Sequence, residues 1–422
     1  MSNNINEWPL PFAEPEEVGV SSDCLARIGP VMQKFIDDRK DPNFITMVIR
    51  RGKIVHYEAQ GYMHIDNKMP VRKDAIYRLW SNTKPITGVA TMICVEEGLL
   101  ALDDPVSKYI PAFKNQRVRA TAPQGPVIGT PTVPVDRDIT VRDCLRNTTG
   151  LTTARRAPLT YLSEFKDLLP KTNLMGPPGL MPAGMRETLS ALAQLPLEFQ
   201  PGTEFEYQVG YPIAGVVIEE ATGQTLDEFY RERIFKPLGM EDSSFYLPKD
   251  KLDRFPTLYS PVREDGKWVL TVSEKPEESE KVIGPGSYFE AGGGGGGVLS
   301  TVADYARFAQ MLLNNGELDG VRILCRKSVE IMTSSHTGKM VLPLSQPDMG
   351  FGMGVGVKKG GGTPSYRSIG TYGWGGAAGT SFFVDPKEEL ICICFTQVFM
   401  HQVMGNNTYL EDFERLVYQS LL

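Results

Sequence analysis

Short apolar runs at both ends of the chain predict β-strands. Near the amino end, two such runs flank Arg51, Gly52 and Lys53, a spacing typical of a β-hairpin. Further strand-like runs follow residue 349, and the last of them precedes an amphipathic helical pattern. The predicted strands occupy residues 44–50, 54–59, 352–358, 367–373, 380–384 and 390–396, and the last helix occupies residues 410–421.

Between these strands, apolar residues recur at helical spacing. Residues 85–99 are apolar on almost every face and carry Gly98 at the position of a C-cap, which is typical of a buried helix. Residues 115–138 and 174–182 are rich in Pro, Gly and Thr, which indicates irregular connections. Further helices are predicted at residues 186–195, 212–222, 225–234 and 302–314.

The order of these elements predicts an α+β fold. Its antiparallel sheet is built from both termini and flanked by helices, and a mainly helical domain is inserted between the two halves. We place the sheet domain at residues 1–110 and 290–422, and the inserted domain, with loops that cover a pocket, at residues 111–289. The glycine run at residues 292–297 marks the return to the sheet domain, because so many glycines destabilise a helix or strand interior.

Composition and charge exclude several classes of function. The formal net charge of -7 is spread along the chain, so a nucleic acid finds little to bind. No apolar run approaches the roughly 20 residues of a membrane helix, and the amino end lacks an export signal, so we expect a cytoplasmic protein without a membrane partner. The six cysteines are scattered and the four histidines form no ligand motif, so we expect no metal and no other cofactor. The oligomeric state is not predicted.

A Ser-x-x-Lys motif at Ser81 and Lys84 is the first candidate for chemistry. Residues three apart share a face of a helix, so the Lys84 amine can reach the Ser81 hydroxyl and activate it as a nucleophile. The motif lies between a strand-like run and the apolar helix at residues 85–99, whose positive end favours negative charge. The alternative is an ordinary N-cap serine. The same spacing recurs at Ser163 and Lys166 in a loop-rich region, where we attribute it to chance.

Three longer segments carry a resemblance to a known family. They are residues 102–111 (LDDPVSKYIP), 139–151 (ITVRDCLRNTTGL) and 296–308 (GGVLSTVADYARF). From about Glu17 onward, the chain resembles the serine β-lactamase and penicillin-binding protein superfamily. Within it, the chain is most similar to the class C β-lactamase-like carboxylesterases known as family VIII esterases, which have a related acyltransferase branch. The resemblance implies a serine β-lactamase-like fold.

The superfamily uses three motifs, which are Ser-x-x-Lys, Tyr-x-Asn or Ser-x-Asn, and Lys-Thr-Gly. The resemblance assigns the first two motifs to four positions of this chain. Ser81 and Lys84 match the first motif fully. Tyr207, which precedes a helical pattern, takes the place of the tyrosine in the second motif. Val209 stands where that motif has an asparagine whose side-chain amide contacts the substrate. We therefore expect Val209 at a substrate-binding position, but without the amide contact.

The third motif, Lys-Thr-Gly in lactamases, corresponds here to Trp374-Gly375-Gly376, which we expect to contact the substrate. The resemblance implies an oxyanion hole made of the backbone N–H groups of Ser81 and Ala377. The two glycines fit a strand edge that a substrate approaches closely, although a glycine-rich turn is the alternative. Because the lysine and the asparagine of the lactamases are both replaced, we expect uncharged esters as substrates.

The sequence therefore predicts a carboxylesterase that cleaves small, short-chain esters through an acyl-enzyme on Ser81, with Lys84 and Tyr207 as the proton-transfer pair. Which of the two is the base stays open, because both side chains have an unperturbed pKa near 10. The alternatives are an acyltransferase that uses an alcohol acceptor, a β-lactamase or D-amino-acid amidase, and a non-catalytic binding protein with this fold. No Gly-x-Ser-x-Gly motif occurs, which argues against an α/β-hydrolase.

Overall fold

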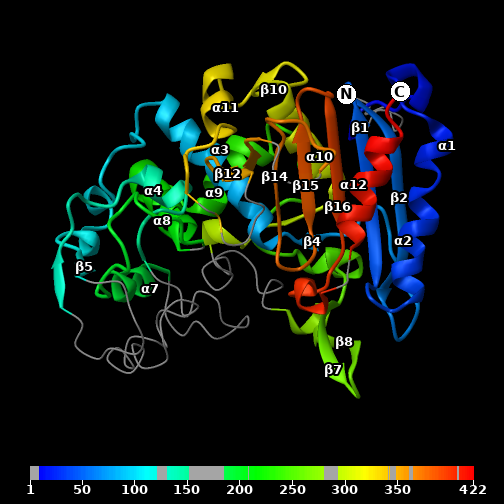
Figure 1. Cartoon of the computed structure of the whole chain (residues 1–422), viewed down its shortest axis with the longest axis horizontal. Helices are drawn as coiled ribbons and strands as arrows, with labels where there is room; N and C mark the ends of the chain where they lie inside the picture. Colours follow the sequence, from blue (N-terminus) through cyan, green and yellow to red (C-terminus); the bar gives the residue numbers. More distant parts are fainter. Residues whose placement is uncertain are drawn as a thin grey trace.

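The computed structural model describes residues 9–120, 131–151, 185–207, 209–279, 293–340, 342, 348–360, 365–405 and 408–422. Its main feature is an eight-stranded sheet in the order β12-β13-β14-β15-β16-β1-β2-β3 (Figure 1). The late strand β16 pairs antiparallel with the early strand β1, with Ile45 opposite Phe395 and Arg50 opposite Leu390. The prediction of an antiparallel sheet built from both ends of the chain is confirmed.

The strands of this sheet are β1 (Asn43–Arg50), β2 (Lys53–His64), β3 (Met69–Pro70), β12 (Met349–Phe351), β13 (Gly356–Lys358), β14 (Tyr372–Gly375), β15 (Ser381–Asp385) and β16 (Leu390–Phe395). Smaller two-stranded sheets pair β4 (Tyr77–Arg78) with β9 (Leu299–Ser300), β5 (Arg117–Arg119) with β6 (Thr132–Pro134), β7 (Leu258–Glu264) with β8 (Lys267–Glu274), and β10 (Glu317–Leu318) with β11 (Val321–Arg322). The helices are α1 (Ser22–Leu25), α2 (Ile28–Asp37), α3 (Thr83–Glu96), α4 (Val141–Leu145), α7 (Met185–Leu192), α8 (Gly210–Thr222), α9 (Leu226–Tyr230), α10 (Val302–Leu313), α11 (Arg326–Met332) and α12 (Tyr409–Gln419).

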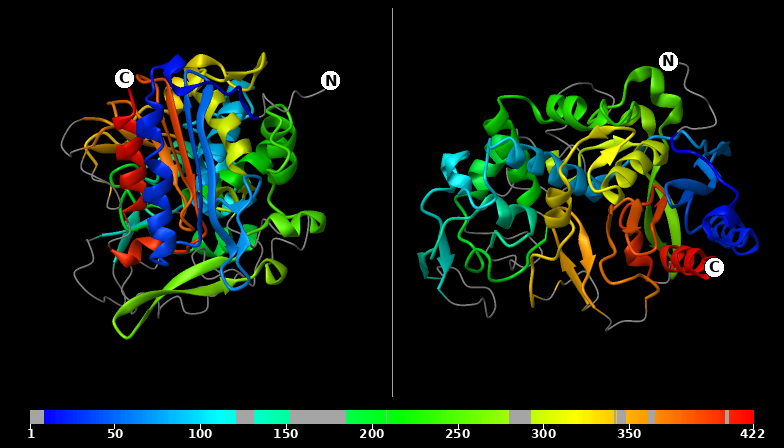
Figure 2. Two further views of the ribbon diagram at one scale, coloured as in Figure 1. Left: turned by 90° about the vertical axis from the view of Figure 1, so that its right-hand side faces the viewer. Right: turned by 90° about the horizontal axis from the view of Figure 1, so that it is seen from above.

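Helices cover both faces of the central strands, which explains why β16 reads Leu-Ile-Cys-Ile-Cys-Phe without a polar residue. Side chains of a strand point alternately to opposite faces. Ile391 and Ile393 join the core cluster that contains α3 and α10, whereas Cys392 and Cys394 pack with residues of α2 and α12. Figure 2 shows α2 and α12 on one side of the sheet and α10 on the other. Both thiols are free, as expected for buried structural cysteines.

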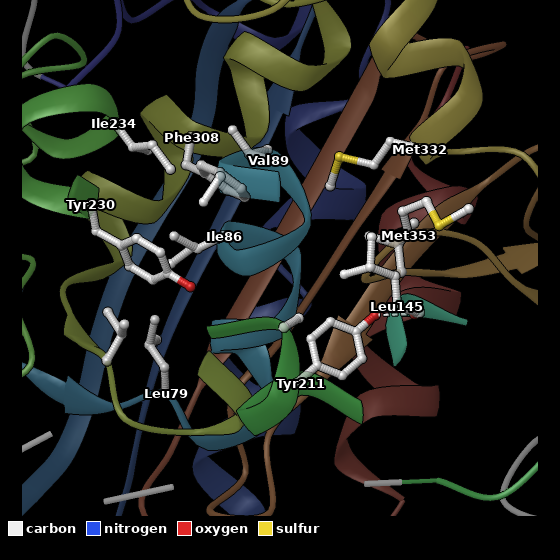
Figure 3. Packing of buried hydrophobic residues seen from close by; sticks show 14 of the residues in the cluster. Leu79, Ile86, Val89, Leu145, Tyr211, Tyr230, Ile234, Phe308, Met332 and Met353 are labelled. Atoms are coloured by element: carbon white, nitrogen blue, oxygen red, sulfur yellow. Dashed lines mark hydrogen bonds between the residues drawn. The ribbon is translucent and has the colours of Figure 1, made fainter. Parts of the chain in front are cut away.

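Helix α3 lies between the sheet and the helical part of the molecule. In Figure 3, Ile86 and Val89 of α3 are surrounded by Phe308, Tyr230 and Tyr211 from other helices. All five belong to one cluster that extends from the sheet into the helical part. This central position accounts for the apolar residues on every face of α3. The division of the chain into two domains stays a prediction.

Two predicted strands are wrong in their extent, and glycine conformations explain both errors. The predicted strand at residues 352–358 is the turn and the second strand of a hairpin formed by β12 and β13, and this turn contains Gly354 at a φ of 104°. A glycine adopts this conformation without steric cost. The predicted strand at residues 367–373 shrinks to β14, because Gly370 turns the chain at a φ of 93° just before it.

A β-hairpin that the sequence analysis did not predict follows the helical part of the chain. Strands β7 and β8 project from the body of the molecule and pair from Leu258 to Glu274. Asp265 and Gly266 form the turn, with φ angles of 47° and 78°, which match a two-residue hairpin loop. Among the described helices, none is long and apolar enough to cross a membrane.

Candidate active site

Ser81 lies in a 3₁₀ turn (Trp80–Asn82) that connects β4 to the first residue of α3. Trp80 has a φ of 49°, a conformation that costs a bulky residue about 1–3 kcal/mol. Three contacts hold it: the Trp80 ring lies 4.8 Å from the ring of Phe399, and the Leu79 backbone is bonded on both sides, by its N–H to Val298 and by its carbonyl to the Thr380 hydroxyl. The turn therefore presents Ser81 in one fixed backbone conformation.

The Lys84 amine reaches Ser81 from the first turn of α3. Its Nζ lies 3.0 Å from Ser81 Oγ and donates to the Gly295 carbonyl at 2.7 Å. The rings of Tyr207 and Tyr211 flank it, with centroids 4.9 Å and 5.5 Å from Nζ. Only 1% of Lys84 is exposed, and this burial lowers the pKa of its amine to about 7. A large neutral fraction is thus available near neutral pH, with a lone pair that can accept the Ser81 proton.

Tyr207 is held by a second side chain of the predicted site. The Trp374 indole Nε1 donates to the Tyr207 hydroxyl oxygen at 2.7 Å, and the two ring centroids are 5.4 Å apart. The buried ring of Phe351 packs edge-on against Trp374 at 4.8 Å and also contacts Tyr207. Because an indole N–H only donates, the Tyr207 oxygen must accept. The structure therefore brings Ser81, Lys84, Tyr207 and Trp374 together through contacts centred on Lys84 and Tyr207.

The glycine segment after Trp374 docks on the turn that carries Ser81. A Cβ atom at Gly376 would lie 2.1 Å from the Leu79 carbonyl oxygen, so no larger residue fits without moving the turn. Gly375 is exposed at the strand end, and Ala377 follows half-buried. The N–H groups of Ser81 and Ala377 donate no hydrogen bond within the part of the chain that the structure describes. Such free donors are what an oxyanion hole requires.

Val209 is buried in the hydrophobic core. It is the N-cap residue of α8 and belongs to the main hydrophobic core, with 3% of its surface exposed. An apolar side chain gains free energy by packing in this way, and little of it is left to face a substrate. A substrate contact by Val209 stays a prediction, whereas Trp374 is partly exposed beside the site.

Residues 31–411 match the family described as beta-lactamase. The chain belongs to the beta-lactamase family. Protein Rv1367c of Mycobacterium tuberculosis is 32% identical over 367 residues, which cover 84% of this chain and 85% of that protein. Esterase EstB of Burkholderia gladioli is 28% identical over 400 residues, or 91% and 93% of the two chains. The structure of EstCE1, a hydrolase with promiscuous acyltransferase activity, matches with a TM-score of 0.73 at 24% sequence identity. The match covers 94% of this chain and 98% of the EstCE1 chain. The predicted superfamily and its serine β-lactamase-like fold are confirmed.

One part of this beta-lactamase-family site was missed from the sequence. Within the glycine run, Gly294 fits between α3 and α8, because a Cβ there would lie 2.9 Å from the Tyr211 carbonyl oxygen and 3.1 Å from Thr87. This close approach aims the Gly295 carbonyl at Lys84. The run therefore shapes the site, rather than only connecting two regions. The available signal was its position just before β9, which pairs with the strand leading to Ser81.

The arrangement can perform acyl transfer to a serine. A hydroxyl, a buried amine and a phenol meet beside two free backbone N–H groups, which is the set of groups that this chemistry needs. The described residues of this beta-lactamase-family chain contain no group of three or more His, Cys, Asp or Glu side chains that could hold a metal ion.

Proposed function

We propose that this protein is a carboxylesterase that cleaves small, uncharged, short-chain esters through an acyl-enzyme on Ser81. The observation that carries the proposal is the 3.0 Å contact between Ser81 Oγ and the amine of Lys84, whose pKa burial lowers to about 7. The esterase name of the Burkholderia gladioli relative supports it over most of the chain.

The proposed reaction has two steps. Ser81 Oγ bonds to the ester carbonyl carbon while its proton moves to the Lys84 amine, and the N–H groups of Ser81 and Ala377 stabilise the oxyanion. The bond to the alcohol oxygen then breaks, and that oxygen takes a proton from the pair of Lys84 and Tyr207. Water attacks the acyl-enzyme by the reverse sequence, which releases the acid and restores the Ser81 hydroxyl.

We assign the first proton transfer to Lys84. A neutral amine has two N–H donors and one lone pair. Lys84 Nζ donates to the Gly295 carbonyl at 2.7 Å and to Ser81 Oγ at 3.0 Å. Proton transfer requires the neutral amine to turn its lone pair toward Ser81 Oγ, which the bond to Gly295 permits because it uses only one of the two N–H donors. Tyr207 is suited to the second transfer, because Trp374 occupies one acceptor position of its oxygen and leaves the phenol hydrogen to point elsewhere.

The proposed substrate class follows from Trp374. Its indole contacts the phenol of Tyr207 at the position where lactamases have a lysine ammonium that holds a carboxylate, so position 374 itself supplies no cation. A neutral ester avoids leaving a buried carboxylate without a partner. A panel of p-nitrophenyl esters from acetate to decanoate, run beside a chromogenic cephalosporin, is expected to favour the short esters by at least about tenfold.

A covalent probe tests the nucleophile directly. A fluorophosphonate should label the protein once, and peptide mapping should place the label on Ser81, because the probe reacts with activated serines. Turnover of p-nitrophenyl butyrate in water should release butyrate, while added methanol reports any acyl transfer as methyl butyrate. No label together with no ester turnover would point to a binding protein with this fold.

Replacing Trp374 by phenylalanine should lower kcat for p-nitrophenyl butyrate about tenfold. The variant keeps an aromatic ring but loses the N–H that donates to Tyr207, and a hydrogen bond to a group that changes charge is worth about 1.5 kcal/mol. KM should stay within about twofold. The control is Trp268→Phe on the exposed face of β8, which should match the wild type. A rise in KM at unchanged kcat would instead make Trp374 a binding residue only.

A further inference from the structure

The turn at residues 352–355, between β12 and β13, sits directly on the part of α3 that carries Lys84. A Cβ atom at Gly88 would lie 2.1 Å from the Met353 carbonyl oxygen, and a Cβ at Gly354 would lie 2.6 Å from the Lys84 carbonyl oxygen. Figure 3 shows Met353 beside α3, near Met332 and Tyr211. Two glycines, one on each partner, thus permit a backbone-to-backbone contact that any side chain would prevent.

The turn is also fixed from its other side. The Met353 N–H donates to the Met332 carbonyl at the end of α11 at 2.9 Å, and the Gly352 N–H donates to Val355 at 2.8 Å. A Cβ at Gly352 would lie 2.3 Å from the Met332 carbonyl oxygen. All residues of the turn are buried. The turn is therefore an apolar segment held between α11 and α3. It cannot move away from α3 without breaking its contacts with Met332.

We propose that this turn keeps water away from Lys84, and that Gly88 and Gly354 are positioning residues that allow it to close on α3. The inference rests on the proposed function, because it explains how the amine that receives the Ser81 proton is kept neutral. It assigns a role to two glycines that touch neither the substrate nor the reacting atoms.

The groups around Lys84 make the access of water the main influence on the pKa of its amine. From α8 and the segment before it, the titratable groups facing the amine are the phenols of Tyr207 and Tyr211, at ring distances of 4.9 Å and 5.5 Å. The glycine segment contributes a carbonyl. The turn contacts α3 at the Lys84 carbonyl and at Gly88, and its residues Gly, Met, Gly and Val carry no titratable side chain. From α3, Thr87 carries a hydroxyl bonded to Tyr230. Burial is the cause that lowers the Lys84 pKa, so admitting water should raise it.

Gly88→Ala tests the inference. The new methyl group must push the Met353 carbonyl away from α3, which admits water and stabilises the Lys84 ammonium. The acidic limb of the pH profile of kcat/KM for p-nitrophenyl butyrate should therefore move up by about one pH unit. Activity at pH 7 should fall about fivefold, because the neutral fraction of the amine drops from about one half to about one eleventh, and most of it should return at pH 9. A lower rate at every pH with an unchanged midpoint would overturn the inference.

Two controls separate hydration from structural damage. Gly316→Ala produces the same kind of clash, 2.1 Å from the Leu324 carbonyl oxygen at a φ of 98°, but far along the chain from the site, so it should lower the melting temperature and leave the midpoint unchanged. Gly360→Ala meets no atom within 4 Å and should behave as the wild type. If Gly88→Ala fails to fold, Met332→Ala loosens the same turn without a clash and should shift the midpoint in the same direction.

The inference and the proposed function fail in different ways. Failure of the proposed function would appear without any change at Gly88, as ester turnover that survives Ser81→Ala or as a wild-type pH profile that is flat around pH 7. Failure of the inference alone would leave the wild-type limb in place and the Gly88→Ala midpoint unmoved.

Discussion

Ser81→Ala is expected to lower kcat for p-nitrophenyl butyrate by at least about 10⁴-fold, the scale on which removal of a covalent nucleophile acts in serine hydrolases. The alanine methyl cannot form the acyl-enzyme, and water alone must then attack the ester. The fold should persist, because the half-buried Ser81 side chain makes a single hydrogen bond to the described residues, the contact with Lys84. The melting temperature should stay within a few degrees, and fluorophosphonate labelling should disappear.

The chain offers a matched control for this substitution. Ser163 has the same Ser-x-x-Lys spacing, with Lys166 three residues later, and lies outside the described residues. Ser163→Ala should keep the turnover and the labelling of the wild type. Turnover of Ser81→Ala within about tenfold of the wild type, with an intact melting transition, would contradict the assignment of the nucleophile.

The elements that were predicted correctly share one property, a strong apolar signal. Strand β16 is buried and apolar at every position, and helix α3 is buried from Thr83 to Cys94 with apolar residues on every face. The hairpin of β7 and β8 was missed because it projects into solvent and carries polar residues on both faces. Its real signal was local, in Asp265 and Gly266, whose dipeptide favours a two-residue turn.

In the candidate site, the residues that act through their side chains were predictable from the sequence, and two features that act through backbone atoms were not. Ser81 and Lys84 follow from helical spacing, and Tyr207 and Trp374 from the family resemblance, because side-chain identity carries those roles. The Gly295 carbonyl and the turn at residues 352–355 act through backbone atoms, which any residue possesses. The sequence indicates them only indirectly, through glycines that allow two backbone segments to approach each other closely. For Val209 the resemblance assigns a position in the motif, while the packing of its apolar side chain decides how much of it is exposed.

Lys84→Met is expected to abolish activity and yet to stabilise the protein at pH 7. Methionine has nearly the shape of the lysine stem but no proton acceptor, so kcat should fall by about 10³-fold or more. The stability effect follows from linkage. Burial lowers the Lys84 pKa from 10.5 to about 7 in the folded state, so between these values the unfolded chain binds the extra proton and folding has to release it.

The sign of the pH dependence is therefore defined. For the wild type, this group should make the free energy of unfolding rise with pH between about 7 and 10, by about 1.4 kcal/mol per unit. Its penalty is about 4 kcal/mol at pH 7 and reaches its full value of about 5 kcal/mol at lower pH. Losing the contacts to Ser81 and Gly295 costs Lys84→Met about 1 kcal/mol each. The variant should thus be more stable than the wild type by about 2 kcal/mol at pH 7, an advantage that vanishes toward pH 9.

Urea unfolding of the two proteins at several pH values checks this, because the difference between them isolates Lys84 from every other titrating group. Lys249→Met, on an exposed lysine, should show no such pH-dependent difference. A Lys84→Met protein that is inactive and equally destabilised at every pH would mean that Lys84 is a charged structural residue in the folded state. An inactive variant whose stability advantage fades as the pH rises would be the result expected of a buried neutral amine retained for its chemistry at a cost in stability.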